Sequence, residues 1–230
     1  MSFTGITPAG AAVAKSASAT ITPVVLELGG KNAFIVYDDA DVDKAVRAAL
    51  EGAFFSKGEA CTAASRILVQ NAVYEEFMAK PGAAVKKIRV GNSMDPKNHV
   101  RACVTKQQQE LVWGYIKKGV KAGAKIASQG ELLADVECKI DFFVLPAFFS
   151  DVHTNLIIAQ DEIFGLVVTV TPFDTEEEAI SITNQSKYGL NNIIYSRDNE
   201  KWLRTARKID AGVVFVNNCS RNLLLSHAEA

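Results

Sequence analysis

Two short stretches of this 230-residue sequence hold the residue types that nucleophilic catalysis requires. The first, residues 54–66 (FFSKGEACTAASR), places Cys61 on a tight turn between a predicted buried helix and a predicted buried strand. The second, residues 24–31 (VVLELGGK), places Glu27 inside an apolar strand that ends at two glycines. A thiolate attacks an electrophilic carbon readily, and a desolvated carboxylate with a raised pKa can act as a general base. The pair therefore predicts a nucleophile and a base.

Each of these residues also has a simple structural interpretation. A lone cysteine followed by Thr62, Ala63 and Ala64 is typical of an inert, buried thiol. A glutamate in an apolar run can be an edge-strand side chain that faces water. On the residues alone, both alternatives stay open for Cys61 and for Glu27.

The elements that must position these residues alternate between strands and helices. A helix is predicted over 8–19, strands over 22–28 and 33–37, and a helix capped by the acids 38–41 leads to Phe54. Strand 66–70 leaves the cysteine turn. Further helices are predicted over 72–88 with a break at Pro81-Gly82, over 104–122, from Thr175 to about 184, and after Asp198; further strands are predicted over 124–127, 142–149, 167–173, 191–196 and 213–216. This order predicts an α/β fold with a parallel sheet, helices on both faces and right-handed crossovers.

Three of these elements carry specific burial predictions. The helix over 104–122 and the helix after Asp198 each present one apolar face, and the strand over 213–216 is the last predicted strand of the core. The residues predicted to be buried on the two helices are Leu111, Val112, Tyr115 and Ile116 on the first, and Trp202, Leu203, Ala206 and Ile209 on the second.

Composition excludes several function classes. The net charge is −1 and no basic run occurs, which argues against a nucleic-acid partner. Charges interrupt every apolar stretch before it reaches membrane-spanning length, and the start lacks a secretory pattern, so a cytoplasmic protein is expected. The four cysteines form no CxxC pair and the three histidines lie far apart. They predict free thiols and no metal site.

Four motifs together resemble the aldehyde dehydrogenase superfamily. They are Phe3-Thr4-Gly5, the LELGGK strand with Glu27, the FFSKGEAC turn with Cys61, and residues 161–165 (DEIFG), in the family's order. The resemblance implies a parallel-sheet aldehyde dehydrogenase catalytic domain over 29–230, preceded in 1–28 by the last element of a nucleotide-binding domain. It also implies NAD(P)-dependent oxidation of a small aldehyde to a carboxylic acid, through a thiohemiacetal and a thioester on the cysteine, in a homo-oligomer.

The resemblance assigns a role to each motif. Cys61 and Glu27 would be the catalytic nucleophile and base. Contacts to NAD or NADP would come from Gly5, Gly10, Leu28, Glu162 and Phe164. Glu162 would accept hydrogen bonds from the hydroxyls of the nicotinamide ribose, and Phe164 would pack near the nicotinamide.

The sequence also departs from the family pattern. Ile6 stands where the family has a serine, Leu166 where it has a proline, and Glu59 where it has a glutamine. The negative charge of Glu59 is expected to raise the pKa of Cys61. The family's upstream oxyanion-hole asparagine, its ribose-contacting lysine and its PFGG-type segment have no counterpart here. The expectation is a catalytic domain cut at both ends, whose exposed edges favour association. An alternative therefore stays open, a relative without dehydrogenase activity that acts by binding or oligomerisation. A CoA-acylating relative is disfavoured because Glu27 is present.

Overall fold

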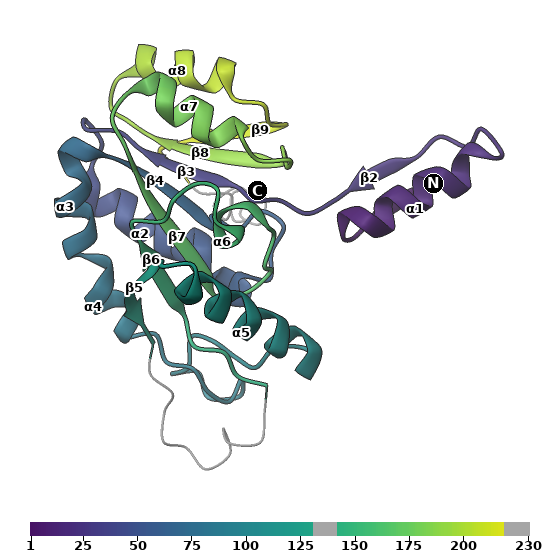
Figure 1. Cartoon of the computed structure of the whole chain (residues 1–230), viewed down its shortest axis with the longest axis horizontal. Helices are drawn as coiled ribbons and strands as arrows, with labels where there is room; N and C mark the ends of the chain where they lie inside the picture. Colours follow the sequence, from purple (N-terminus) through teal and green to yellow (C-terminus); the bar gives the residue numbers. More distant parts are fainter. Residues whose placement is uncertain (131–141, 219–230) are drawn as a thin grey trace, which may run out of the picture.

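A seven-stranded sheet forms the centre of the computed structural model, which describes residues 1–130 and 142–218 (Figure 1). The strand order is β5-β6-β7-β4-β3-β8-β9, and all neighbours are parallel except the antiparallel pair β5 and β6. The strands are β3 (Ala33–Val36), β4 (Arg66–Gln70), β5 (Lys125–Gln129), β6 (Ala147–Ser150), β7 (Val167–Phe173), β8 (Asn191–Tyr195) and β9 (Val213–Val216). The predicted α/β class with a mostly parallel sheet is confirmed.

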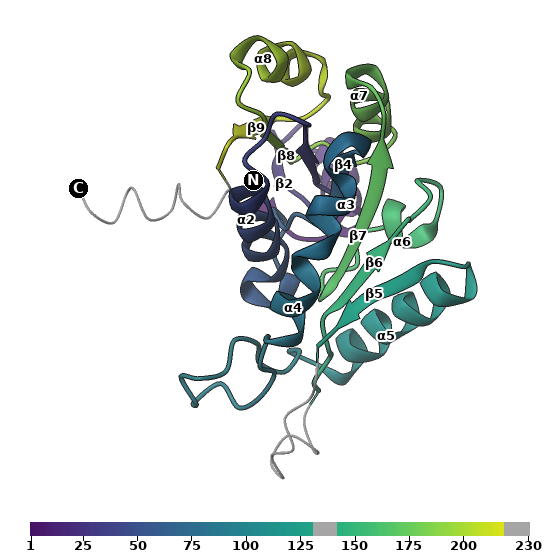
Figure 2. The ribbon, with the colours of Figure 1, turned by 90° about the vertical axis from the view of Figure 1, so that its left-hand side faces the viewer.

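Helices cover both faces of this sheet, as Figure 2 shows with the sheet seen nearly edge-on. Helices α2, α3 and α4 lie on one face and α5, α6 and α7 on the other, with α8 packed beside α7. Their bounds are α2 (Val42–Phe54), α3 (Asn71–Ala79), α4 (Pro81–Lys86), α5 (Lys106–Lys121), α6 (Ile157–Gln160), α7 (Glu176–Asn184) and α8 (Asn199–Lys208). Pro81 begins α4 and so separates it from α3, which confirms the predicted break.

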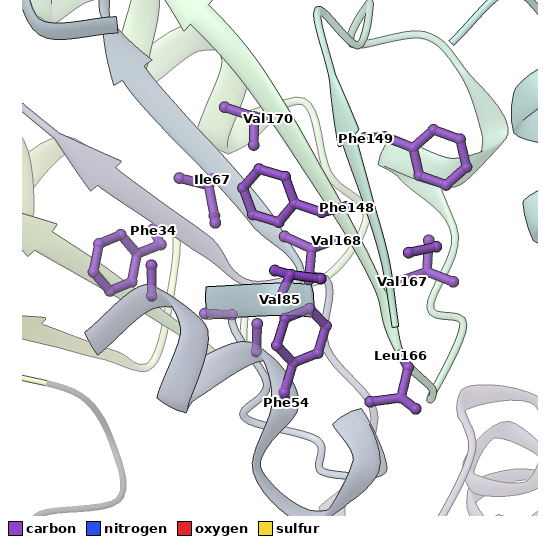
Figure 3. Close-up of a cluster of buried hydrophobic side chains, with 14 of the residues drawn as sticks. Phe34, Phe54, Ile67, Val85, Phe148, Phe149, Leu166, Val167, Val168 and Val170 are labelled. Atoms are coloured by element: carbon purple, nitrogen blue, oxygen red, sulfur yellow. The ribbon is translucent and has the colours of Figure 1, made fainter. Parts of the chain in front are cut away.

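The core between α2 and the sheet fixes the entry to the cysteine turn (Figure 3). Helix α2 begins at Asp41, whose carboxylate accepts a hydrogen bond from the backbone N–H of Lys44, and it buries a stripe of alanines against the strands. Along β6 the side chains alternate, so Phe148 points toward α2 and Phe149 toward the opposite face. The packing of α2 against the sheet therefore fixes where residues 55–61 begin.

A small unit precedes the main sheet and projects away from it in Figure 1. It consists of β1 (Ser2–Thr4), α1 (Thr7–Ser18) and β2 (Val25–Glu27), with β1 and β2 paired in parallel. Strand β2 is shorter than the predicted 22–28, because its only partner has three residues and Pro23 offers no N–H for a ladder bond. The assignment of residues 1–28 to a nucleotide-binding domain stays a prediction.

Some predicted burial is wrong. Leu111 on α5 is 42% exposed and Leu203 on α8 is 40% exposed, since each lies at the margin of its helix's apolar stripe. Strand β9 is an edge strand, not a core strand, and its Val213 is 49% exposed. Two of the four predicted free thiols, Cys138 and Cys219, lie outside the described residues.

Arg66, the first residue of β4, joins three parts of the fold through buried hydrogen bonds. Its Nε donates to the carbonyl of Lys31 at 2.8 Å, and its two terminal nitrogens donate to the carbonyls of Ile182 and Thr183 at 3.1 Å each. Those two carbonyls belong to the last turn of α7, where a cation also complements the helix dipole. Arg66 therefore ties the segment before β3 to the end of α7.

We expect Arg66→Lys to lower the free energy of unfolding by about 2–4 kcal/mol, because a single ammonium cannot reach three separated carbonyls and leaves buried acceptors unpaired. Urea unfolding followed by circular dichroism measures the difference. Arg47→Lys, at an exposed position of α2, is the matched control and should change stability by less than about 0.5 kcal/mol. Equal effects of the two substitutions would contradict the role given to Arg66.

Candidate active site

The loops that precede three neighbouring strands, β3, β4 and β7, lie together at the amino ends of those strands. Ala33 of β3 pairs with Arg66 of β4, and Arg66 pairs with Thr169 of β7, so these strands begin at nearly the same level. The segments just before them carry the GGK, cysteine and DEIFG motifs. Parallel pairing therefore brings three motifs that are distant in sequence to the amino ends of the strands.

Asn32 connects the first two of these loops. Its side-chain Nδ2 donates to the carbonyl of Cys61 at 2.8 Å and to the carbonyl of Ala63 at 3.0 Å, and its Oδ1 accepts from the backbone N–H of Asn191 at 3.3 Å. Asn32 is buried, so these bonds do not compete with water. Asn32 was not among the predicted site residues, although a polar amide directly before an apolar strand is a signal that could have indicated it.

Cys61 presents its sulfur on an otherwise packed turn. The residue is exposed and its thiol is free, whereas Ala63 and Ala64 just after it are buried. The N–H of Ala64 donates to the carbonyl of Gly52 at the end of α2, at 3.1 Å. The inert, buried interpretation of this cysteine is therefore wrong, since a reagent can reach the sulfur while the backbone around it is fixed.

The Gly29-Gly30 dipeptide lies between the cysteine turn and Glu162. The N–H of Gly30 donates to Glu162 Oε1 at 3.2 Å, and a Cβ on Gly29 would collide with the same carboxylate. A Cβ on Gly30 would lie 2.7 Å from the carbonyl oxygen of Cys61. Only glycines allow both loops to approach this closely, which explains the two glycines that end the predicted strand.

The DEIFG motif supplies an acid and an aromatic ring. Burial raises the pKa of Glu162, while the hydrogen bond from Gly30 and the charge of Lys31 act in the opposite direction. Phe164 has a left-handed backbone, with φ of 55°, and its ring is 41% exposed. This strained conformation presents an apolar surface beside a half-buried carboxylate.

Lys31 is a fully buried cation, 1% exposed, whose Nζ makes no hydrogen bond within the described residues. Burial, and after it the positive charge of Arg66, lower the pKa of Lys31 to about 7, against the opposing charges of Asp161 and Glu162. Arg66 has its own carbonyl partners, so the two acids are the counter-charges left for Lys31. The sequence analysis did not single out this residue.

Glu27 and three predicted cofactor contacts lie together in the β1–α1–β2 unit. The N–H of Gly5 donates to the carbonyl of Glu27 at 3.0 Å, and Leu28 packs so closely on Gly10 that a Cβ there would lie 2.5 Å from it. Glu27 itself is exposed in β2, so the described residues do not provide the desolvation that the sequence analysis invoked for it. The structure thus forms two groups, one around Glu27 and one around Cys61 and Glu162.

Glu59, just before the nucleophile candidate, pairs with Lys57 at 2.8 Å. The thiol whose pKa this acid raises is Cys103, where burial acts first and the charge of Glu59 adds to it. This effect of Glu59 on Cys103 was not predicted, and the effect expected on Cys61 stays a prediction.

Across residues 1–130 and 142–218, no group of histidine, cysteine, aspartate or glutamate side chains gathers in a way that could hold a metal ion. In the same described part of the chain, no helix is long and apolar enough to cross a bilayer.

We expect Lys31→Met to remove a pH dependence of stability. Between the folded pKa of about 7 and the unfolded value near 10.5, the unfolded chain binds a proton that the folded chain lacks, so the free energy of unfolding rises with pH by up to about 1.4 kcal/mol per unit. This rise should be absent from the variant when urea unfolding is compared at pH 7, 8 and 9. Lys97→Met, at an exposed position, should follow the wild type. Parallel curves for wild type and Lys31→Met would contradict the assignment.

Comparison with known proteins gives consistent matches over nearly the whole chain. The model of the aldehyde dehydrogenase family matches residues 1–225. An aldehyde dehydrogenase of Didymella fabae is 52% identical over 224 residues, which are 97% of this chain and 45% of that protein. The betaine aldehyde dehydrogenase of Bacillus subtilis is 36% identical over 95% of this chain and 44% of its own length.

Solved structures give the same result. A structure of Staphylococcus aureus betaine aldehyde dehydrogenase in complex with NAD+ matches with a TM-score of 0.90 and 38% identity, over 95% of this chain and 43% of that one. The chain therefore spans less than half the length of these relatives. Because the family model covers almost every residue, the protein belongs to the aldehyde dehydrogenase family, a family of oxidoreductases.

Proposed function

We propose that this chain performs the thiol chemistry of an NAD(P)-dependent oxidation of an aldehyde to a carboxylic acid. The observation that carries the proposal is the meeting of two loops on Gly29-Gly30, one bearing Cys61 and the other bearing Glu162. A nucleophile and a cofactor-holding acid must lie close together for a carbon bound to the first to react beside the second.

The residues fit a nicotinamide dinucleotide. Glu162 is a half-buried acceptor suited to ribose hydroxyls, and the exposed ring of Phe164 is suited to one face of a nicotinamide. Helix α1 has no side-chain cap at Ile6, which leaves its amino end available to a phosphate beside Gly5 and Gly10. When bound, the dinucleotide supplies the hydride acceptor. The NAD+ complex of the S. aureus relative supports this choice, and NADP is the alternative.

Cys61 carries the covalent chemistry in this proposal. Its thiolate attacks the aldehyde carbon, which forms a carbon–sulfur bond and places negative charge on the carbonyl oxygen. Loss of hydride from that carbon leaves a thioester on Cys61. The bond from Asn32 to the Cys61 carbonyl holds the backbone during both steps.

Glu27 is the proposed base for release of the product. Its carboxylate takes a proton from water, the water oxygen adds to the thioester carbon, and the carbon–sulfur bond breaks to give the acid and free Cys61. Because Glu27 is exposed, the proposal requires that bound substrate and cofactor cover it and desolvate it.

Association of this chain with a second copy is also part of the proposal. Among the described residues, strand β9 is the last strand of the sheet, and its outer edge can pair with a second copy of the chain, which supports a homo-oligomer. The competing function, a relative that binds or oligomerises without turnover, would leave the same edge in use.

We expect saturable binding of NAD to the purified chain, measured by isothermal titration calorimetry, and expect Glu162→Gln to weaken that binding by about tenfold through loss of charge-assisted hydrogen bonds. Glu177→Gln, an exposed acid on α7, is the matched control and should bind as the wild type does. A parallel titration with NADP decides between the two cofactors.

The same preparation tests the thiol chemistry. Incubation with an aldehyde panel and NAD should form carboxylic acid, detected by mass spectrometry, and Cys61→Ala should abolish it whereas Cys103→Ala should not. Binding of NAD without acid formation would favour the non-catalytic alternative. Acid formed equally by Cys61→Ala would refute the role of the thiol.

A further inference from the structure

Three consecutive residues of the turn that leads to Cys61, Ser56 to Gly58, have a left-handed backbone. The φ angles are 50° at Ser56, 67° at Lys57 and 70° at Gly58. Glycine adopts this region freely, but serine and lysine do so at an energetic cost. Ser56 and Lys57 are therefore strained within the turn that leads to Cys61, and other interactions must hold them there.

A buried ion pair lies within this turn. Lys57 Nζ is 2.8 Å from Glu59 Oε2, and the two side chains are only 8% and 10% exposed. Lys57 Nζ also donates to the carbonyl of Ala102 at 3.1 Å, which connects the turn to the loop before α5. The N–H of Glu59 donates to the carbonyl of Ser56 at 3.0 Å and closes the turn.

The opposite side of the turn is fixed by close contact. A Cβ on Gly58 would lie 2.5 Å from the carbonyl oxygen of Gly165, so the turn rests directly on the DEIFG loop. The cysteine turn is therefore held from two directions, by the Lys57–Glu59 pair toward Ala102 and by backbone contact toward Gly165.

The two charges depend on each other. A buried charge whose partner is removed remains desolvated without compensation, whereas removal of both charges leaves no such penalty. A neutral amide in place of Glu59 could not compensate the buried charge of Lys57. Lys57 and Glu59 therefore act as a pair.

We propose that the Lys57–Glu59 ion pair locks the left-handed turn onto the loop at Ala102 and so fixes the position of Cys61. Both are positioning residues, since they act through the turn and not on a substrate. The inference rests on the proposed role of Cys61 as nucleophile.

Other charged groups face the same turn and supply the control. A cavity of about 630 Å³ beside it is lined by Lys57 and also by Glu51, His99 and Arg101. Glu51 is an exposed acid on α2 that borders this cavity without pairing to Lys57 in any ion pair of the described residues. Glu51→Gln therefore changes the same charge near the same turn and leaves the lock intact.

The test is a double-mutant cycle read by amide hydrogen exchange. We expect Glu59→Gln and Lys57→Gln each to speed exchange in the peptide covering 52–66 by about tenfold or more, because either change breaks the lock. The double variant should exchange no faster than the faster single variant, so that the two effects are not additive. Lys57→Arg, which keeps the cation, should resemble wild type. Exchange in β8 is the internal reference and should not change, nor should Glu51→Gln change the turn.

Cys103 gives a second readout that a merely structural role would not move. Its thiol lies beside the pair, and its pKa is raised by burial and then by the charge of Glu59. Glu59→Gln should therefore shift the pH profile of Cys103 alkylation to lower pH, Lys57→Gln should shift it to higher pH, and Glu51→Gln should leave it in place. Iodoacetamide labelling with peptide mass spectrometry measures all three.

The outcomes separate this inference from the proposed function. Additive effects in the cycle, faster exchange spread equally to β8, or an unmoved Cys103 profile would each overturn the lock. These measurements are made in a Cys61→Ala background, where thiol catalysis is absent. A failed lock therefore leaves the NAD and acid-formation experiments unaffected, and a failed activity leaves the lock standing on its own result.

Discussion

The site depends on one constraint, the parallel pairing that makes β3, β4 and β7 begin at the same level. Ala33 pairs with Arg66 and Arg66 with Thr169, so the segments before these strands must share one edge of the sheet. That edge lies at the amino ends, whereas ligands of open α/β sheets commonly bind beyond the carboxyl ends. Asn32 turns this proximity into a fixed geometry, because its one side chain bonds to the backbone of Cys61, Ala63 and Asn191.

Charge adds a second layer to this arrangement. Arg66 and Lys31 are neighbouring buried cations, and their different partners give them different functions. Arg66 uses its three donors on carbonyls, so its charge is solvated by the backbone and its effect is structural. The Nζ of Lys31 has no hydrogen-bond acceptor among the described residues, and the charges of Asp161 and Glu162 act on it through space. Glu162 also contacts the segment that holds Lys31 directly, through the hydrogen bond from the N–H of Gly30.

The sequence predicted what local chemistry determines. The bounds of β4, the break at Pro81 and the caps Asp41, Thr175 and Asp198 were all predictable, because each depends on a residue's own backbone preference or on a partner within one turn. Exposure was predicted less well, since it depends on what lies opposite. Leu111, Leu203 and strand β9 all have apolar patterns, yet no described element covers them fully. The target of Glu59 was missed for the same reason, because Cys103 is distant in sequence.

The two glycines after β2 determine whether the predicted site residues can work together. Glu27, Gly5, Gly10 and Leu28 form one group, and Cys61 with Glu162 forms the other. Residues 29 and 30 follow directly on Leu28 of the first group, and the N–H of Gly30 donates to Glu162 of the second. A side chain at either position would push Glu162 or the Cys61 carbonyl away. The glycines therefore permit the close approach of Glu162 and the Cys61 carbonyl to this segment, a condition that the residue types of the proposed base and nucleophile do not specify.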